Sequence, residues 1–157
     1  MSWLTRVRNA LPFGEKRDTP DNLWHKCRAC TQMVFVKEWQ DNLCVCPRCG
    51  HHDRIGAKER FEQLFDDAMY KRIDSPAVAD DPLRFRDSKK YIDRLKAARV
   101  ATGDRDAYSN AYGRIGGREA VIGVQDFAFM GGSMGVAVGE AFVAGVEAAI
   151  KRGAPYI

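Results

Sequence analysis

Four cysteines near the start of the sequence have the residue type and spacing of metal ligands. Cys27-Arg28-Ala29-Cys30 and Cys46-Pro47-Arg48-Cys49 form two CxxC pairs that are separated by fifteen residues. Two such pairs can place four thiolates tetrahedrally around Zn²⁺, whose binding free energy then replaces a core that a short segment cannot supply. Because four thiolates leave no open position for water or substrate, the pattern predicts a structural zinc ribbon with one zinc ion.

Other potential ligands lie close to these two pairs. Cys44 precedes Cys46 by two residues and completes no further CxxC pair, so we expect it to lie outside the ligand set. His25, His51 and His52 flank the pairs and are interpreted as surface residues, because four thiolates already close the site. All five cysteines lie between positions 27 and 49, which favours a reducing cytoplasmic compartment over a secreted disulfide scaffold.

A glycine-rich segment from Gly131 to Gly135 is the second feature that could do chemistry. It contains Ser133, which we expect to cap the helix that follows. Backbone N–H groups at such a helix start can hold an anion, either a phosphate or the oxygen of an enolate formed beside a thioester. A tight strand-to-helix turn whose glycines serve only packing fits equally well, because the segment lacks the lysine of a Walker phosphate loop.

The net charge of +4 comes from the first sixty residues, which hold eleven Lys/Arg against seven Asp/Glu, whereas the remainder holds fourteen of each. This excess would allow weak binding to RNA or DNA, although a solvated basic surface is the favoured interpretation. A second basic run could contact the phosphates of a nucleotide-like ligand, and here too a solvated helix face is favoured. Its members are Arg84, Arg86, Lys89, Lys90, Arg94 and Lys96.

The elements that position these residues follow from composition and periodicity. Residues 1–22 are predicted to form a flexible lead-in, and residues 23–55 the zinc ribbon. Residues 57–69 are predicted to form an amphipathic helix, because apolar side chains recur there at helical spacing. These side chains are Phe61, Leu64, Phe65 and Ala68.

An irregular surface connection is expected next, over residues 71–87, because it contains two prolines and several aspartates. Ser88 is placed to cap a helix that runs to about Ala101, and Gly103 is placed to end it. The inward face of this helix is predicted to consist of Tyr91, Ile92, Leu95 and Ala98.

Two strands over residues 107–115 and 118–127 are predicted to pair through a tight turn at Gly116-Gly117. Residues 136–150 are apolar around most of the helical circumference and are predicted to form a core helix, in which Gly139 and Gly145 allow close packing. A further strand is expected to start at Tyr156. This order indicates a right-handed βαβ crossover in an α/β fold, and no apolar run is long enough to span a membrane.

Four sequence motifs occur together in a characteristic order. They are Trp24-His25-Lys26-Cys27, Cys46-Pro47-Arg48-Cys49-Gly50-His51-His52, Phe85-Arg86-Asp87-Ser88-Lys89-Lys90-Tyr91 and Phe127-Ala128-Phe129-Met130-Gly131-Gly132-Ser133-Met134-Gly135. Over residues 23–157 the sequence resembles the β subunit of bacterial acetyl-CoA carboxylase carboxyltransferase, in which the same motifs follow one another.

The resemblance implies a zinc ribbon followed by a crotonase-like (ClpP/crotonase) core. It implies a role in an α₂β₂ carboxyltransferase that moves a carboxyl group from carboxybiotin, on a biotin carboxyl carrier protein, to acetyl-CoA, giving malonyl-CoA for fatty acid biosynthesis. A separate biotin carboxylase would consume ATP. Gly131, Gly132 and Ser133 match a motif that lines the substrate site of the family, whereas no side chain is assigned as a catalytic residue.

The resemblance also sets an expectation about length. Chains of the family continue further, so residues 56–157 are expected to be a truncated, N-terminal portion of the carboxyltransferase domain. This portion is expected to have little activity without the missing half and the α subunit. The rival hypothesis is a nucleic-acid-binding zinc ribbon, for which the basic excess of the first sixty residues is the support. Against it, the ribbon lacks a dense array of aromatic and basic residues for stacking bases.

Overall fold

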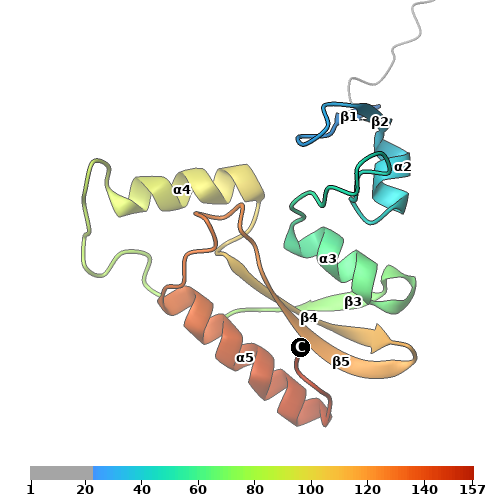
Figure 1. Cartoon of the computed structure of the whole chain (residues 1–157). Coiled ribbons are helices and arrows are strands. Elements are labelled where there is room, and N and C mark those ends of the chain that lie inside the picture. Colours follow the sequence, from blue (N-terminus) through green and yellow to red (C-terminus); the bar gives the residue numbers. More distant parts are fainter. Residues whose placement is uncertain (1–22) are drawn as a thin grey trace, which may run out of the picture. The chain divides into compact units, whose positions relative to one another are not determined.

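The structure is a computed structural model that describes residues 23–157, so the predicted lead-in at 1–22 lies outside the described residues. The chain divides into two compact units, with the boundary between Asp53 and Arg54 (Figure 1). The ranges predicted for the ribbon and for the carboxyltransferase portion stay predictions. Within residues 23–157, no helix has the length and apolar content needed to cross a membrane.

The first unit is built on a short antiparallel hairpin. Strands β1 (Trp24–Lys26) and β2 (Met33–Phe35) pair with Trp24 opposite Phe35, and helix α2 (Val36–Asp41) follows at once. The small core of this unit contains Cys27, Val34 and Cys46, with Trp39 packed against it. Sulfur atoms thus occupy the place where a larger domain would have aliphatic side chains, which agrees with a unit that depends on a metal ion.

A three-stranded antiparallel sheet forms the centre of the second unit. Its strand order is β3 (Tyr70–Ile73), β4 (Tyr108–Ile115) and β5 (Arg118–Gln125). The predicted hairpin is confirmed, because β4 and β5 pair over their whole length and turn at Gly116 and Gly117, which both have positive φ. β3 was missed within the segment expected to be irregular, because Tyr-Lys-Arg-Ile is too short and too polar for a clear two-residue period.

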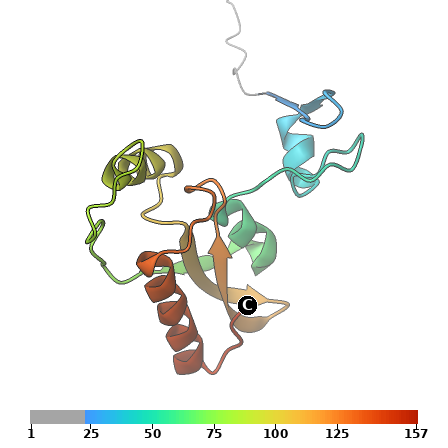
Figure 2. The same ribbon diagram turned by 60° about the vertical axis from the view of Figure 1, so that its left-hand side comes forward.

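Helix α3 (Ala57–Leu64) and helix α5 (Val136–Arg152) cover opposite faces of this sheet (Figures 1 and 2). Phe61 and Phe65 pack on the face that presents Ala111 and Ile122. The helix predicted over residues 57–69 is shorter than expected, because Phe65 takes an extended conformation and a 3₁₀ turn (Asp66–Ala68) follows. Neighbouring residues along β4 point the other way, toward α5.

A buried polar network connects β4 with α5 and with the last residues of the chain. Asn110 Nδ2 donates to the Ala141 carbonyl at 2.6 Å, and the Tyr156 hydroxyl donates to Asn110 Oδ1 at 2.9 Å. The Tyr108 and Tyr156 hydroxyls are 2.8 Å apart. Tyr156 lies opposite Val121 in a parallel bridge, so the chain returns beside β5 in the parallel direction that the sequence predicted.

The prediction of a core helix over residues 136–150 is confirmed for one face of α5 only. One face is buried, through Val138, Ala141, Gly145 and Ala149, whereas the opposite face is exposed. Gly145 allows the expected close packing, because a Cβ there would lie 2.4 Å from Asn110 Oδ1. Gly139 does not, since a Cβ there would meet no atom of the described residues within 4 Å.

Helix α4 (Tyr91–Thr102) begins later than predicted. Its N-cap is Lys90, not Ser88, and Gly103 ends it in a left-handed conformation as expected. Ser88 instead accepts a hydrogen bond from Arg94 at 3.2 Å, in the turn that precedes the helix. The predicted inward face is confirmed: Leu95 is buried in a second core with Ala107, Phe129 and Val138, and Tyr91, Ile92 and Ala98 pack against it.

Asp66 stabilises the turn of the β4–β5 hairpin through hydrogen bonds, and the pH dependence of unfolding tests this role. Its carboxylate accepts the backbone N–H groups of Gly116 and Gly117 at 2.8 and 2.7 Å, and these bonds hold the pKa of Asp66 below its usual value. A lowered folded-state pKa stabilises the fold above the unfolded-state pKa of about 4, and this contribution is lost as the pH falls through the folded-state pKa. We expect Asp66→Asn to lower the urea midpoint at pH 7 and to have less effect in acid.

The matched control is Asp67→Asn, because Asp67 is exposed, adjacent and free of these two bonds. Both variants are compared with the unchanged chain by urea unfolding at pH 7 and pH 3. Equal midpoint shifts for the two variants, or a shift for Asp66→Asn that does not depend on pH, would contradict the assignment.

Candidate functional site

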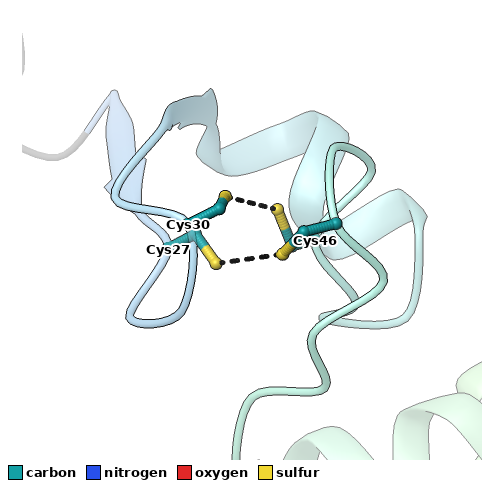
Figure 3. Close-up of side chains that lie close together, drawn as sticks. Cys27, Cys30 and Cys46 are labelled. Atoms are coloured by element: carbon teal, nitrogen blue, oxygen red, sulfur yellow. Dashed lines mark hydrogen bonds between the residues drawn. The ribbon is translucent and has the colours of Figure 1, made fainter.

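The sulfur atoms of Cys27, Cys30, Cys46 and Cys49 form one cluster, as the sequence predicted. All four Sγ atoms lie within 4.8 Å of one another. The Sγ atoms of Cys27 and Cys49 are 3.7 Å apart, and those of Cys30 and Cys46 are 3.8 Å apart. Figure 3 shows the labelled side chains of Cys27, Cys30 and Cys46 extending from two facing loops toward a shared centre.

Two loops of matching backbone geometry position these thiols. In the first, Thr31 N–H donates to the Cys27 carbonyl at 3.0 Å, and in the second, Gly50 N–H donates to the Cys46 carbonyl at 2.9 Å. Thr31 and Gly50 both have positive φ, which turns the chain sharply just after each CxxC pair. Each loop thereby places its two sulfur atoms on the side that faces the other loop.

The thiols of the cluster differ in acidity. The backbone N–H of Cys30, hydrogen-bonded to Cys27, lowers the pKa of the Cys27 thiol to about 6. For Cys49 the backbone N–H of His51 acts in the same direction, but burial and the neighbouring thiols outweigh it and raise the pKa to about 12. Four thiolates at these distances repel one another, so their joint ionisation requires a cation at the centre.

The geometry fits a tetrahedral metal site. A metal–sulfur distance of about 2.3 Å, as for zinc, gives sulfur–sulfur edges of about 3.8 Å in a regular tetrahedron. The Cys27–Cys49 and Cys30–Cys46 edges have about this length, and each joins the two loops. These four cysteines could therefore hold one metal ion. Cys44 is buried and is not a member of the group.

A carboxylate and two aromatic rings support the cluster from within the same unit. Asp53 Oδ2 accepts hydrogen bonds from Trp39 Nε1 at 3.0 Å and from His25 Nε2 at 2.8 Å, and its side chain is 7% exposed. The rings of His25 and Trp39 stack with centroids 4.3 Å apart. The interpretation of His25 as a surface residue is thus wrong, because it is partly buried between these partners. No local pattern identified Asp53 in advance, because it lies outside both CxxC pairs.

The glycine-rich segment before α5 does not have the predicted cap. Gly135 is the N-cap residue of α5, and Ser133 lies two residues earlier with an exposed side chain. Gly132 N–H donates to the Phe129 carbonyl at 2.8 Å, and Gln125 Nε2 donates to the Gly132 carbonyl. Within residues 23–157, no hydrogen bond occupies the backbone N–H groups of Gly131 and Ser133. These two donors are therefore available to a ligand.

A pocket of about 450 Å³ opens beside this segment. Ser133 and Gly135 line it together with residues 78–83, and Leu95 and Phe129 contribute apolar side chains. The pocket is large enough for one arm of a small-molecule ligand and is mostly apolar, which is typical of ligand sites. Gly131 and Gly132 are not among the residues that line it.

The segment that borders this pocket is attached to α4 by an ion pair. Arg99 donates to both carboxylate oxygens of Asp80, at 2.9 and 2.6 Å, and this contact lowers the pKa of Asp80. Sequence reasoning missed both residues, because a lone aspartate in an irregular segment has no pattern that pairs it with a distant arginine. In the basic run, Arg94 contacts Asp87, which agrees with a structural role for that arginine.

Comparison with known proteins gives one consistent result. No family model matches the chain. The chain is 64% identical over 157 residues to "Acetyl-coenzyme A carboxylase carboxyl transferase subunit beta" of Novosphingobium aromaticivorans. The matched region covers 100% of this chain and 55% of that relative. Proteins of the same name from Caulobacter vibrioides and Methylobacterium nodulans are 49% and 47% identical, over 99% and 100% of this chain and 50% and 52% of their own lengths.

The similarity extends along the entire chain and includes both compact units. The chain spans about half the length of the curated relatives it matches. Over all of its 157 residues, the chain is thus similar to curated proteins that carry the name acetyl-coenzyme A carboxylase carboxyl transferase subunit beta.

Proposed function

We propose that the chain supplies the first half of a β subunit that transfers a carboxyl group from carboxybiotin to acetyl-CoA, giving malonyl-CoA for fatty acid biosynthesis. The observation that carries this proposal is the 64% identity over the whole chain to a protein with the carboxyl transferase name. The second unit is proposed to be the start of a crotonase-like core. Its sheet with helices on both faces is compatible with such a core.

The metal of the first unit is proposed to be one structural Zn²⁺. Four thiolates at tetrahedral spacing are the donor set that zinc prefers, and they leave no coordination position for a reactant. When bound, the ion would fold and stiffen the ribbon and would take no part in carboxyl transfer. Cys27, Cys30, Cys46 and Cys49 are the residues that would hold it.

Gly131, Gly132 and Ser133 are proposed to line the substrate site. In the reaction the acetyl-CoA methyl group loses a proton, a C–C bond forms to the carboxyl carbon, and the N–C bond of carboxybiotin breaks as its nitrogen takes up a proton. The negative charge that develops on the thioester oxygen requires preorganised donors. The unoccupied N–H groups of Gly131 and Ser133 support such a role, and the pocket beside Ser133 could accept part of the substrate.

We propose an assembly with other acetyl-CoA carboxylase subunits, which the relatives' name supports. It contains a carboxyltransferase α subunit in an α₂β₂ complex, a biotin carboxyl carrier protein, and a biotin carboxylase that consumes ATP, all in the cytoplasm. No described side chain is proposed as a general base, so the proton acceptor would come from elsewhere in the assembly. A ribbon that acts mainly by binding RNA or DNA is not favoured, because the relatives with this ribbon carry a carboxyl transferase name.

An activity comparison tests the proposal. This chain, and a hybrid that joins it to the unmatched portion of the Novosphingobium relative, are each mixed with the α subunit of that organism. Malonyl-CoA decarboxylation in the presence of biocytin is then followed. We expect activity from the hybrid at a level similar to that of the intact relative, and little from the chain alone. A folded hybrid without activity would refute the proposed function.

A further inference from the structure

Helix α5 has an exposed row of apolar residues, here called the seam, on the side that faces away from the sheet. Val136, Val143 and Ile150 recur at intervals of seven residues and are 68%, 51% and 74% exposed. The buried residues of the helix, among them Ala141 and Gly145, lie on the opposite side. Heptad spacing of apolar residues is the pattern of a helix that packs lengthwise against another helix. A purely solvent-exposed face would have polar residues at these positions.

Gly139 lies within this seam and has no role inside the described residues. A Cβ at this position would meet no atom within 4 Å, and the backbone is helical, so neither packing nor conformation requires glycine here. Glycine in the interior of an exposed helix is unfavourable relative to alanine. A closely approaching helix would account for it, because small residues at a helix interface allow two backbones to come together.

Two unpaired carboxylates border the seam on one side. Glu140 and Glu147 are exposed, lie seven residues apart, and form no ion pair with any residue between 23 and 157. Flanking charges of this kind select the partner of a helix pair. In an antiparallel pair of two copies, Glu140 of one copy would face Glu147 of the other, which is repulsive. The seam therefore fits a different helix, with Lys or Arg beside its own apolar residues.

We propose that this outward face of α5 docks an apolar, basic-flanked helix from the portion of the β subunit that the relatives contain and this chain does not span. The relatives are about twice as long as this chain, so a portion of domain size is available to cover the face. After α5, residues 155–157 pair with β5, the strand on which α5 packs. In the relatives, the residues that follow this position therefore start close to α5. The inference goes beyond the proposed function, because it concerns assembly and not chemistry.

Cysteine accessibility tests this docking. Val143→Cys is introduced into this chain and into the hybrid with the unmatched portion of the Novosphingobium relative, and alkylation by iodoacetamide is followed peptide by peptide. Val100→Cys on α4, where valine is 88% exposed, is the matched control. We expect position 143 to react as fast as position 100 in this chain, and at least about tenfold more slowly in the hybrid, because docking protects it. Position 100 should react alike in both proteins.

Charge and size variants distinguish docking from a change in the helix itself. Glu147→Lys and Gly139→Leu should speed alkylation at position 143 in the hybrid, while the thermal midpoint of this chain alone does not fall. Equal reactivity of position 143 in both proteins would overturn the proposal. So would protection that already appears in this chain and grows with its concentration, which would indicate a second copy, or protection that appears only when the α subunit is added. No readout depends on carboxyltransferase activity.

Discussion

Replacing Cys46 with serine is expected to unfold the first unit and leave the second unit folded. Cys46 is buried and contributes one of the four clustered sulfur atoms, and the remaining core of this unit is small. Structural zinc sites contribute about 10–16 kcal/mol of apparent binding free energy, which is far more than such a core supplies. Amide resonances of residues 24–52 should collapse to random-coil positions in NMR spectra, whereas those of the second unit keep their dispersion.

The matched control for this experiment is Cys44→Ala. Cys44 is also buried and lies two residues away, but it is outside the sulfur cluster. We expect this variant to retain one zinc ion per chain by mass spectrometry of the intact protein, and to keep the native resonances of the ribbon. Retention of zinc by Cys46→Ser, or loss of zinc from Cys44→Ala, would show that the ligand set is wrong.

Substituting alanine for glycine at two positions of α5 is expected to have opposite effects. At Gly145 a Cβ would lie 2.4 Å from Asn110 Oδ1 and 2.7 Å from Tyr156 Cε2. Asn110 cannot easily retreat, because its amide bonds the Ala141 carbonyl and the Tyr156 hydroxyl. Overpacking of this kind costs about 1–3 kcal/mol. Gly145→Ala should therefore lower the free energy of unfolding by about this amount, despite the higher helix propensity of alanine.

Gly139→Ala is the control in the same helix. Nothing lies within 4 Å of a Cβ at this position, so only the helix propensity changes. We expect stabilisation by about 0.5–1 kcal/mol in this chain. Urea unfolding followed by circular dichroism measures both variants. A stabilising effect at both positions would mean that Asn110 and Tyr156 do not pack against Gly145 as the structure has them.

The parts of the fold that could be predicted are those with local sequence signals. The CxxC spacing identified the sulfur cluster, and Gly116-Gly117 between two apolar runs identified the β4–β5 hairpin. The exposed face of α5 could not be predicted from periodicity, because residues that pack on the sheet and residues of the outward seam are equally apolar. Position along the helix, and not residue type, separates Val138 from Val143.

The remaining features of the site depend on contacts between residues that are distant in the sequence. Arg99 meets Asp80 across nineteen positions, and Asp53 meets His25 across twenty-eight. Neither aspartate stands out locally, since the chain has many charged residues that are exposed. The prediction that Ser133 caps α5 was wrong for a different reason. Several residues between Gly131 and Gly135 suit a helix start, and the helix begins after the last of them.

The most direct test of the functional assignment is growth complementation in a bacterium whose own β subunit can be depleted. The depleted β subunit is replaced by the hybrid of this chain with the unmatched portion of the Novosphingobium relative. Growth is then measured without added fatty acids. The assignment predicts growth comparable to that given by the intact relative, and loss of growth when Cys46 is changed to serine. A hybrid that accumulates in folded form but does not support growth, while the intact relative does, would contradict it.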